Sequence, residues 1–111
     1  MARYTYTILS RSKPGQEAEY EAWYRDRHVD DVIKMPGVLS ARLFNLEFQR
    51  VYDLDAPQYQ LMTIYELDCE DPEATIDAIK AASGSEDMPG TDTLDKGGMI
   101  QIAGRLIAAR D

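Results

Sequence analysis

The sequence predicts an α+β fold in which a four-stranded antiparallel sheet carries two helices on one face. Segments in which apolar residues alternate with a period of two are expected to be strands, and segments with helical spacing lie between them. Their order along the chain is βαββαβ, which is the ferredoxin-like pattern. A length of 111 residues fits this pattern as one domain over residues 1–111.

Residues 3–11 are expected to form the first strand, because Tyr, Thr and Ile suit a pleated surface. One face of this strand carries Tyr4, Tyr6, Ile8 and Ser10. The turn at 12–15 leads into a helix over residues 16–34. Pro36 ends that helix, because the residue before a proline is pushed out of the α region.

Two stripes are expected along the first helix. The apolar stripe consists of Ala18, Ala22, Val29, Val32 and Ile33. The second stripe consists of Tyr20, Tyr24, His28 and Asp31, whose spacings of four, four and three place them on one line. Tyr20 is expected near the helix surface.

The second half of the chain supplies the remaining elements. Residues 38–50 and 59–68 alternate as strands and are expected to form a hairpin with a short loop. A helix begins at Asp71-Pro72-Glu73 and ends at Ser83-Gly84. Residues 85–98 are rich in Gly, Asp and Ser and are interpreted as a mobile connection or lid. Residues 99–109 are expected to form the last strand.

The last strand has apolar residues on both faces. Met99, Ala103 and Ile107 fall on one face, and Ile100, Ile102 and Leu106 fall on the other. A sheet face in water should instead alternate with polar residues. The pattern therefore predicts a homodimer that packs sheet to sheet and buries roughly 800 Å² per chain.

Composition excludes several classes of function. The chain has 12 Lys and Arg against 20 Asp and Glu, a net charge of −8, so neither nucleic acid nor an anionic membrane is an expected partner. One cysteine, Cys69, and one histidine cannot form a disulfide or a multi-ligand metal site. Without a signal sequence or an apolar run of membrane-spanning length, a cytoplasmic location is expected.

Residues 15–44 resemble the EthD-like proteins of the dimeric α+β barrel superfamily. The matching residues are Trp23, Tyr24, His28, Pro36, Gly37, Val38, Ala41 and Arg42. The resemblance implies a homodimer with back-to-back sheets and a pocket between sheet and helices in each subunit. It also implies a class of chemistry, because enzymes of this superfamily include cofactor-free monooxygenases, lactone isomerases and polyketide cyclases or dehydratases.

His28 is the first candidate for catalysis. Its ordinary pKa of about 6.5 allows it to take or give a proton near neutrality, and enolisation, dehydration and cyclisation all need such a base. Asp31, one turn later, is expected to orient the imidazole or to raise its pKa. The alternative is a structural histidine that is hydrogen-bonded to a neighbour.

Arg42 is the second catalytic candidate. It lies on a mostly apolar strand, expected across the pocket from His28, and its guanidinium would bind a carboxylate or enolate oxygen. An ion pair with Glu47, Asp31 or a partner chain is the alternative. Substrate-binding candidates are Tyr6, Trp23, Tyr24 and Tyr65, for each of which core packing is the alternative.

These residues favour a small enzyme that needs no cofactor. Its substrate would be a small hydrophobic carbonyl compound of aromatic or polyketide type, with His28 as acid and base. A non-catalytic small-molecule-binding or stress-response protein is the alternative. A third hypothesis, haem chemistry with one axial histidine, is disfavoured by the few basic residues available for the propionates.

Overall fold

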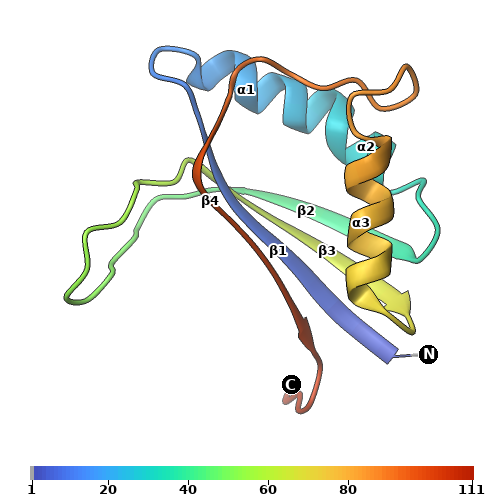
Figure 1. Cartoon of the computed structure of the whole chain (residues 1–111). Helices are drawn as coiled ribbons and strands as arrows, with labels where there is room; N and C mark the ends of the chain where they lie inside the picture. The colour runs from blue at the N-terminus through green and yellow to red at the C-terminus, as the bar shows by residue number, and fades with distance from the viewer. Residues whose placement is uncertain (1) are drawn as a thin grey trace.

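The computed structural model describes residues 2–111 as one antiparallel sheet with helices on one face (Figure 1). The elements, in order, are β1 (Ala2–Ser12), α1 (Glu17–Trp23), the π-helix η1 (Tyr24–His28), α2 (Val29–Val32), β2 (Val38–Asn45), β3 (Leu61–Cys69), α3 (Pro72–Ala82) and β4 (Leu94–Arg105). Because α1, η1 and α2 are consecutive segments of one helix, the order is βαββαβ. The sheet has the strand order β2-β3-β1-β4. The predicted fold class is confirmed.

The register of the sheet decides which side chains face the helices. Tyr6 in β1 lies opposite Tyr65 in β3 and Ala103 in β4, and Ala41 in β2 lies opposite Tyr65 on the other side. Side chains at alternate positions point to opposite faces. The helix-facing positions of β1 and β3 are buried from Tyr6 to Ser12 and from Leu61 to Cys69.

The core lies between this face and the helices. Its main cluster joins buried residues of β1 and β3 to Val32, Ile79 and Met88. A smaller cluster consists of Tyr20, Tyr24 and Leu61. The apolar stripe predicted for the first helix is only partly buried, since Ala18 and Ile33 are exposed. Tyr20 is 1% exposed, so its expected surface position is wrong and the tyrosine stripe is the packed one.

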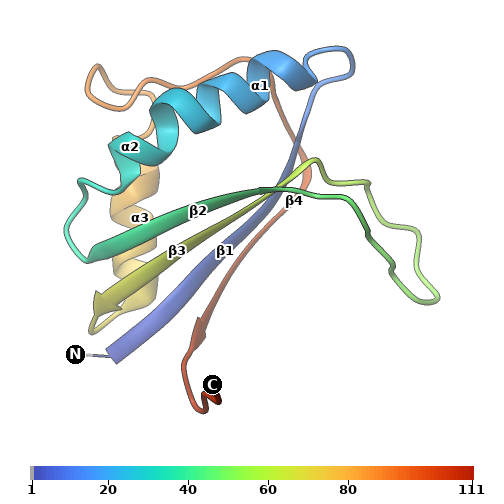
Figure 2. The same cartoon turned by 180° about the vertical axis from the view of Figure 1, so that it is seen from behind.

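The connection between β2 and β3 is longer than predicted. β2 ends at Asn45 instead of residue 50, and β3 begins at Leu61 instead of residue 59. Asn45 and Leu61 form the last pair of the ladder, and residues 46–60 extend beyond the sheet (Figures 1 and 2). The alternation in this segment suggested a strand, but no neighbouring strand pairs with it.

The segment predicted as a mobile lid is held by specific contacts. Met88 is buried in the main core, the backbone N–H of Lys13 donates to the carbonyl of Thr93 over 2.7 Å, and the strand β4 already begins at Leu94. β4 also ends at Arg105 instead of residue 109. Residues 96–99 have a turn-forming composition and lie where β4 is irregular, between Asp95, which pairs with Arg11, and Ile100, which pairs with Leu9. The start of the strand before this irregularity was therefore not predicted.

The other sheet face and the end of β4 are left uncovered. Every residue from Ile100 onward is exposed. The uncovered face, called the open face below, carries the apolar residues Leu9, Phe44, Met62, Ile64, Ile100 and Ile102. No helix among residues 2–111 is long and apolar enough to cross a membrane.

Candidate active site

The first helix widens by one residue per turn at the centre of the candidate site. In η1 the backbone N–H of Val29 donates to the carbonyl of Tyr24, five residues earlier. In a regular α-helix, residues five apart point about 140° away from each other. The wider turn instead brings Trp23 and His28 together, with ring centroids 4.4 Å apart and planes 20° from parallel. Single π turns of this kind are frequent at functional sites.

The predicted line of tyrosines and histidine is present in the structure. The ring of Tyr24 lies edge-on between two neighbours, 5.7 Å from Tyr20 and 5.1 Å from His28. Trp23 contacts the same three rings, because it stacks on both Tyr20 and His28 and meets Tyr24 edge-on. His28 is thereby held in an aromatic surrounding that leaves little water around the imidazole.

Burial lowers the pKa of His28 to about 4, and the carboxylate of Asp31 opposes this shift only in part. Asp31 does raise the pKa of His28, as expected, but desolvation outweighs this effect and the pKa lies below its ordinary value. At neutral pH the imidazole is uncharged and one ring nitrogen can accept a proton. Its Nδ1 is buried and has no hydrogen-bond partner among residues 2–111.

Asp31 is paired with an arginine instead of orienting His28. Its Oδ2 accepts a hydrogen bond of 2.7 Å from Nε of Arg27, and Nη2 of Arg27 donates to the carbonyl of Asp87. The Asp31 side chain is only 7% exposed, and a carboxylate at that depth needs a cation beside it. Arg27, one helical turn earlier, supplies that cation, so the predicted partnership with His28 is replaced by an ion pair.

The helix-facing side of the sheet carries buried hydroxyls. Tyr65 and Thr63 in β3 are both fully buried, and neither hydroxyl has a hydrogen-bond partner among the described residues. The rings of Tyr6 and Tyr65 lie 5.7 Å apart. The hydroxyl of Tyr24 is near enough to those of Thr63 and Tyr65 to affect its pKa, although no bond of normal length joins them. We call Tyr24, Thr63 and Tyr65 the hydroxyl cluster.

All of these phenols are protonated at neutral pH. Burial raises the pKa of Tyr6 to about 12 and raises those of Tyr24 and Tyr65 well above the ordinary value. Each hydroxyl can therefore donate a hydrogen bond to an oxygen atom. Tyr20 differs, because its hydroxyl donates to Oγ of Ser10 over 2.7 Å. Tyr20 is thus a satisfied core residue.

Trp23 connects the helix to the segment before β4. Its indole Nε1 donates to the carbonyl of Pro89 over 3.2 Å, while its ring covers one side of His28. Trp23 is half-buried. It therefore forms a wall beside His28, and its part in binding a substrate stays a prediction.

Arg42 is not where the sequence reasoning placed it. It lies opposite Ile64 in the ladder, so it shares the open face, whereas Tyr65 and the helices lie on the other side. The side chain is exposed, and its Nη1 is 3.4 Å from Oγ of Ser40. The expected placement across a pocket from His28 is wrong, because the register is shifted between Val38 and Ser40.

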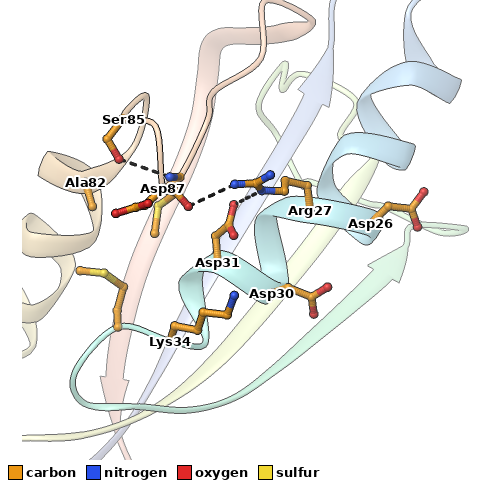
Figure 3. Close-up of a pocket in the computed structure, with 10 residues that line it drawn as sticks. Asp26, Arg27, Asp30, Asp31, Lys34, Ala82, Ser85 and Asp87 are labelled. Carbon is orange, nitrogen blue, oxygen red and sulfur yellow. Dashed lines mark hydrogen bonds and ion pairs between the residues drawn. The ribbon is translucent and has the colours of Figure 1, made fainter.

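A cleft of about 700 Å³ opens on the helical side of the molecule (Figure 3). The first helix forms one side of this cleft, and the end of α3 and the segment after it form the other. Its lining residues include Asp26, Asp30, Asp31 and Asp87, with Met35 and Met88 as apolar members. Neither His28 nor any residue of the hydroxyl cluster lines this cleft. Arg27 and Asp31, on either side of His28 in the sequence, do line this acidic cleft.

Sequence reasoning missed Thr63 as a site residue. A threonine in a strand normally needs no special explanation. The available signal was its position two residues before Tyr65, which places both side chains on one face. Among residues 2–111, no group of three or more His, Cys, Asp or Glu side chains is placed to hold a metal ion.

Comparison with known proteins supports the fold. No protein-family model matches the sequence, and no curated protein matches it. A protein from Shewanella loihica PV-4, described as a candidate monooxygenase, is 19% identical in structural alignment and has a TM-score of 0.55, with 99% of this chain and 97% of that chain covered. An EthD-family (ethyl tert-butyl ether D) protein from Bacillus halodurans C-125 is 11% identical with a TM-score of 0.53, with 96% of this chain and all of the other covered. At these identities the likeness concerns the fold, and this chain has the α+β fold that both proteins share.

Proposed function

We propose that this protein is a small, cofactor-independent enzyme of the EthD-like type that acts on a hydrophobic, aromatic or polyketide-like carbonyl compound. The observation that carries the proposal is the neutral, half-buried His28, whose buried Nδ1 has no partner among the described residues. The hydroxyls of Thr63 and Tyr65 on the helix-facing side of the sheet also lack partners. Unpaired buried polar groups cost stability. Proteins tend to retain such costly features where activity needs them.

The chemistry would begin with proton transfer from carbon. The neutral imidazole of His28 would take the proton next to the carbonyl group, and the electron pair of that bond would move onto the carbonyl oxygen. A protonated hydroxyl of Tyr65 or Thr63 would stabilise the resulting enolate by donating a hydrogen bond. Isomerases, cyclases and dehydratases share this first step, and a monooxygenase would let the deprotonated substrate react with dioxygen.

Substrate would reach His28 between the first helix and the sheet. The walls would be Trp23, Tyr24 and Tyr6. In the structure the first two contact the imidazole of His28, and Tyr6 contacts Tyr65 of the hydroxyl cluster. Entry requires the Trp23 side chain to move, since its ring is stacked on the imidazole. Release of the Trp23–Pro89 hydrogen bond would allow that movement.

Exchange of a carbon-bound proton tests this function directly. We expect the protein to accelerate loss of the α-proton signal of benzoylacetone, an aromatic 1,3-diketone, in deuterated buffer followed by proton NMR. His28→Gln removes the base with little change in volume and is expected to reduce the exchange to the buffer rate. Asp30→Asn is the matched control on the same helix, because Asp30 is exposed. An unchanged rate for His28→Gln would exclude His28 as the base.

A non-catalytic small-molecule-binding protein is the second candidate. The low pKa of His28 favours it, because a base with a pKa of about 4 is weak at neutral pH. In that case benzoylacetone would quench Trp23 fluorescence with no acceleration of proton exchange. His28→Gln would then alter affinity alone.

We further propose a cytoplasmic homodimer that packs through the open face. Its support is the exposed apolar surface there, including Phe44 and Ile102. Arg42 would lie in this interface, where an ion pair with the partner chain is its proposed role. Light scattering is expected to give about twice the chain mass of 12.6 kDa, and a monomer would contradict the proposal.

A further inference from the structure

The connection between β2 and β3 is an arm that carries exposed apolar side chains. Residues 46–60, called the arm below, project away from the sheet in both views (Figures 1 and 2). Phe48, Tyr52 and Leu54 are each more than 70% exposed, and Val51 is 51% exposed. Apolar side chains gathered in this way on a surface mark an interaction site.

The base of the arm is fixed to the body of the protein. The side-chain amide of Gln49 replaces a strand partner for Tyr59: its Oε1 accepts from the backbone N–H of Tyr59 over 2.8 Å, and its Nε2 donates to the Tyr59 carbonyl. The Tyr59 hydroxyl donates to the carbonyl of Gly98 in β4 over 2.7 Å. The arm therefore leaves the sheet in a defined direction.

Side chains on the arm are already ordered against one another. The guanidinium of Arg50 lies 4.9 Å from the ring centre of Phe48 and 5.9 Å from that of Tyr52, and it donates to the Tyr52 hydroxyl over 3.2 Å. Aromatic residues and arginine are enriched at the centres of interfaces. Side chains that are ordered before binding lose less entropy when a partner arrives.

A second uncovered surface lies at the C-terminal end of β4. This strand pairs with β1 alone, so its outer edge is free. Ile102, Leu106 and Ile107 are all more than half exposed there. A free strand edge with apolar side chains is a hazard for aggregation unless something covers it. We call residues 100–107 the bare corner.

The arm and the bare corner occupy diagonally opposite corners of the sheet. β2 and β4 are the two edge strands. They run in opposite directions, because each step across the sheet is antiparallel. The arm follows the end of β2, and the bare corner comprises the last residues of β4 and the two that follow it. The two therefore lie at different edges and at opposite ends of the sheet. Within one chain they cannot meet.

We propose that the arm of one chain covers the bare corner of a second copy of the same chain. A two-fold axis between two facing sheets, along the other diagonal, exchanges these corners, so each arm meets the partner's bare corner. Such contacts occur twice in a symmetric dimer, and sheets that pack face to face at a large angle are a known arrangement. The net charge of −8 disfavours an anionic membrane or nucleic acid as the occupant.

This inference rests on the proposed open-face homodimer and is tested with it. The arm variant is Phe48→Ser/Tyr52→Ser/Leu54→Ser, in which all three side chains are exposed, so the fold should be retained and checked by circular dichroism. The control is Ile33→Ser, which changes an exposed apolar residue on the helical side. Sedimentation equilibrium is expected to give a dimer dissociation constant raised about tenfold or more in the arm variant and unchanged in the control.

A mixed sample locates the contact. Chains with labelled isoleucine and leucine methyl groups are combined with unlabelled chains, and filtered NOEs are expected from Ile102 or Ile107 to the rings of Phe48 or Tyr52 across copies. If the arm variant dimerises as tightly as the unmodified protein, the arm inference is overturned while the open-face dimer stands. If the unmodified protein is monomeric, both are overturned.

Discussion

Tyr20 and Tyr65 offer a paired test of the unpartnered hydroxyl. Both side chains are almost fully buried on the same side of the sheet. The hydroxyl of Tyr20 donates to Ser10, whereas that of Tyr65 has no partner among residues 2–111. Substitution by phenylalanine removes one oxygen atom at each position and leaves the ring in place, so the two variants differ chiefly in what the hydroxyl contacts.

The expected changes in the free energy of unfolding have opposite signs. Tyr65→Phe removes the cost of burying an unpaired hydroxyl, so we expect stabilisation of about 1 kcal/mol. Tyr20→Phe removes a hydrogen bond and leaves Ser10, 1% exposed, without its partner, so we expect destabilisation of about 1–3 kcal/mol. In a domain of this size, 1 kcal/mol shifts Tm by roughly 4 °C.

Urea unfolding followed by far-UV circular dichroism measures both variants. The midpoints should move apart while the slope with denaturant stays constant, which shows that the compactness of the unfolded state has not changed. If Tyr65→Phe is destabilised as much as Tyr20→Phe, its hydroxyl is bonded in solution. The interpretation of the hydroxyl cluster as a preorganised binding site would then be refuted.

Three further predictions concern charge and backbone. Burial lowers the pKa of His28 to about 4, so between pH 6.5 and 4 the unfolded chain binds more protons than the folded protein. As the pH falls through that window, the free energy of unfolding should therefore decrease by up to about 1.4 kcal/mol per pH unit. Urea unfolding of His28→Gln should show a weaker dependence on pH. Arg27→Met should destabilise by about 1–3 kcal/mol because it leaves the buried Asp31 unpaired. Arg25→Met removes ion pairs to exposed partners and should leave the free energy of unfolding nearly unchanged in the same assay. Gly98→Ala should lower Tm, since its φ is +76° and a Cβ would lie 2.5 Å from Pro57, while Gly104→Ala, with open space around it, should not; equal Tm values would contradict this.

The order of elements could be predicted because periodicity along the chain is a local property. The tyrosines and Ile8 of β1 alternate cleanly, and the Asp71-Pro72 start of α3 has its expected cap, with the Asp71 carboxylate accepting from the N–H of Ala74. Strand ends were less predictable. Residues 46–50 continue the alternation of β2 but leave its partner at Leu61, and a strand exists only where another strand pairs with it.

The candidate site was predictable in composition and not in detail. Spacing placed Tyr20, Tyr24 and His28 on one line, as the structure has them. The Trp23–His28 stack was not foreseeable, because it depends on a π turn that helical periodicity does not reveal. The side of the sheet that Arg42 occupies depends on the irregularity after Val38, which reverses the alternation counted from the start of the strand.

The choice of partner for Asp31 follows from competition between two neighbours. Arg27 and His28 both lie about one turn earlier on the helix, and the guanidinium keeps its charge at any accessible pH. A histidine in an aromatic surrounding would have to be protonated to compete. Burial therefore leaves His28 neutral, and the ion pair takes up the carboxylate that was expected to orient its imidazole.

The π turn decides how the geometry around His28 would respond to a change in the number of residues in the helix. Because η1 places one residue more in its turn than an α-helix does, deletion of a single residue there, such as the exposed Asp26, would restore regular winding. Trp23 and His28 would then be four residues apart, which is about 40° around a regular helix, so both rings would stay on the same side. The contact between the two rings therefore requires either the present π turn or a regular turn that is one residue shorter.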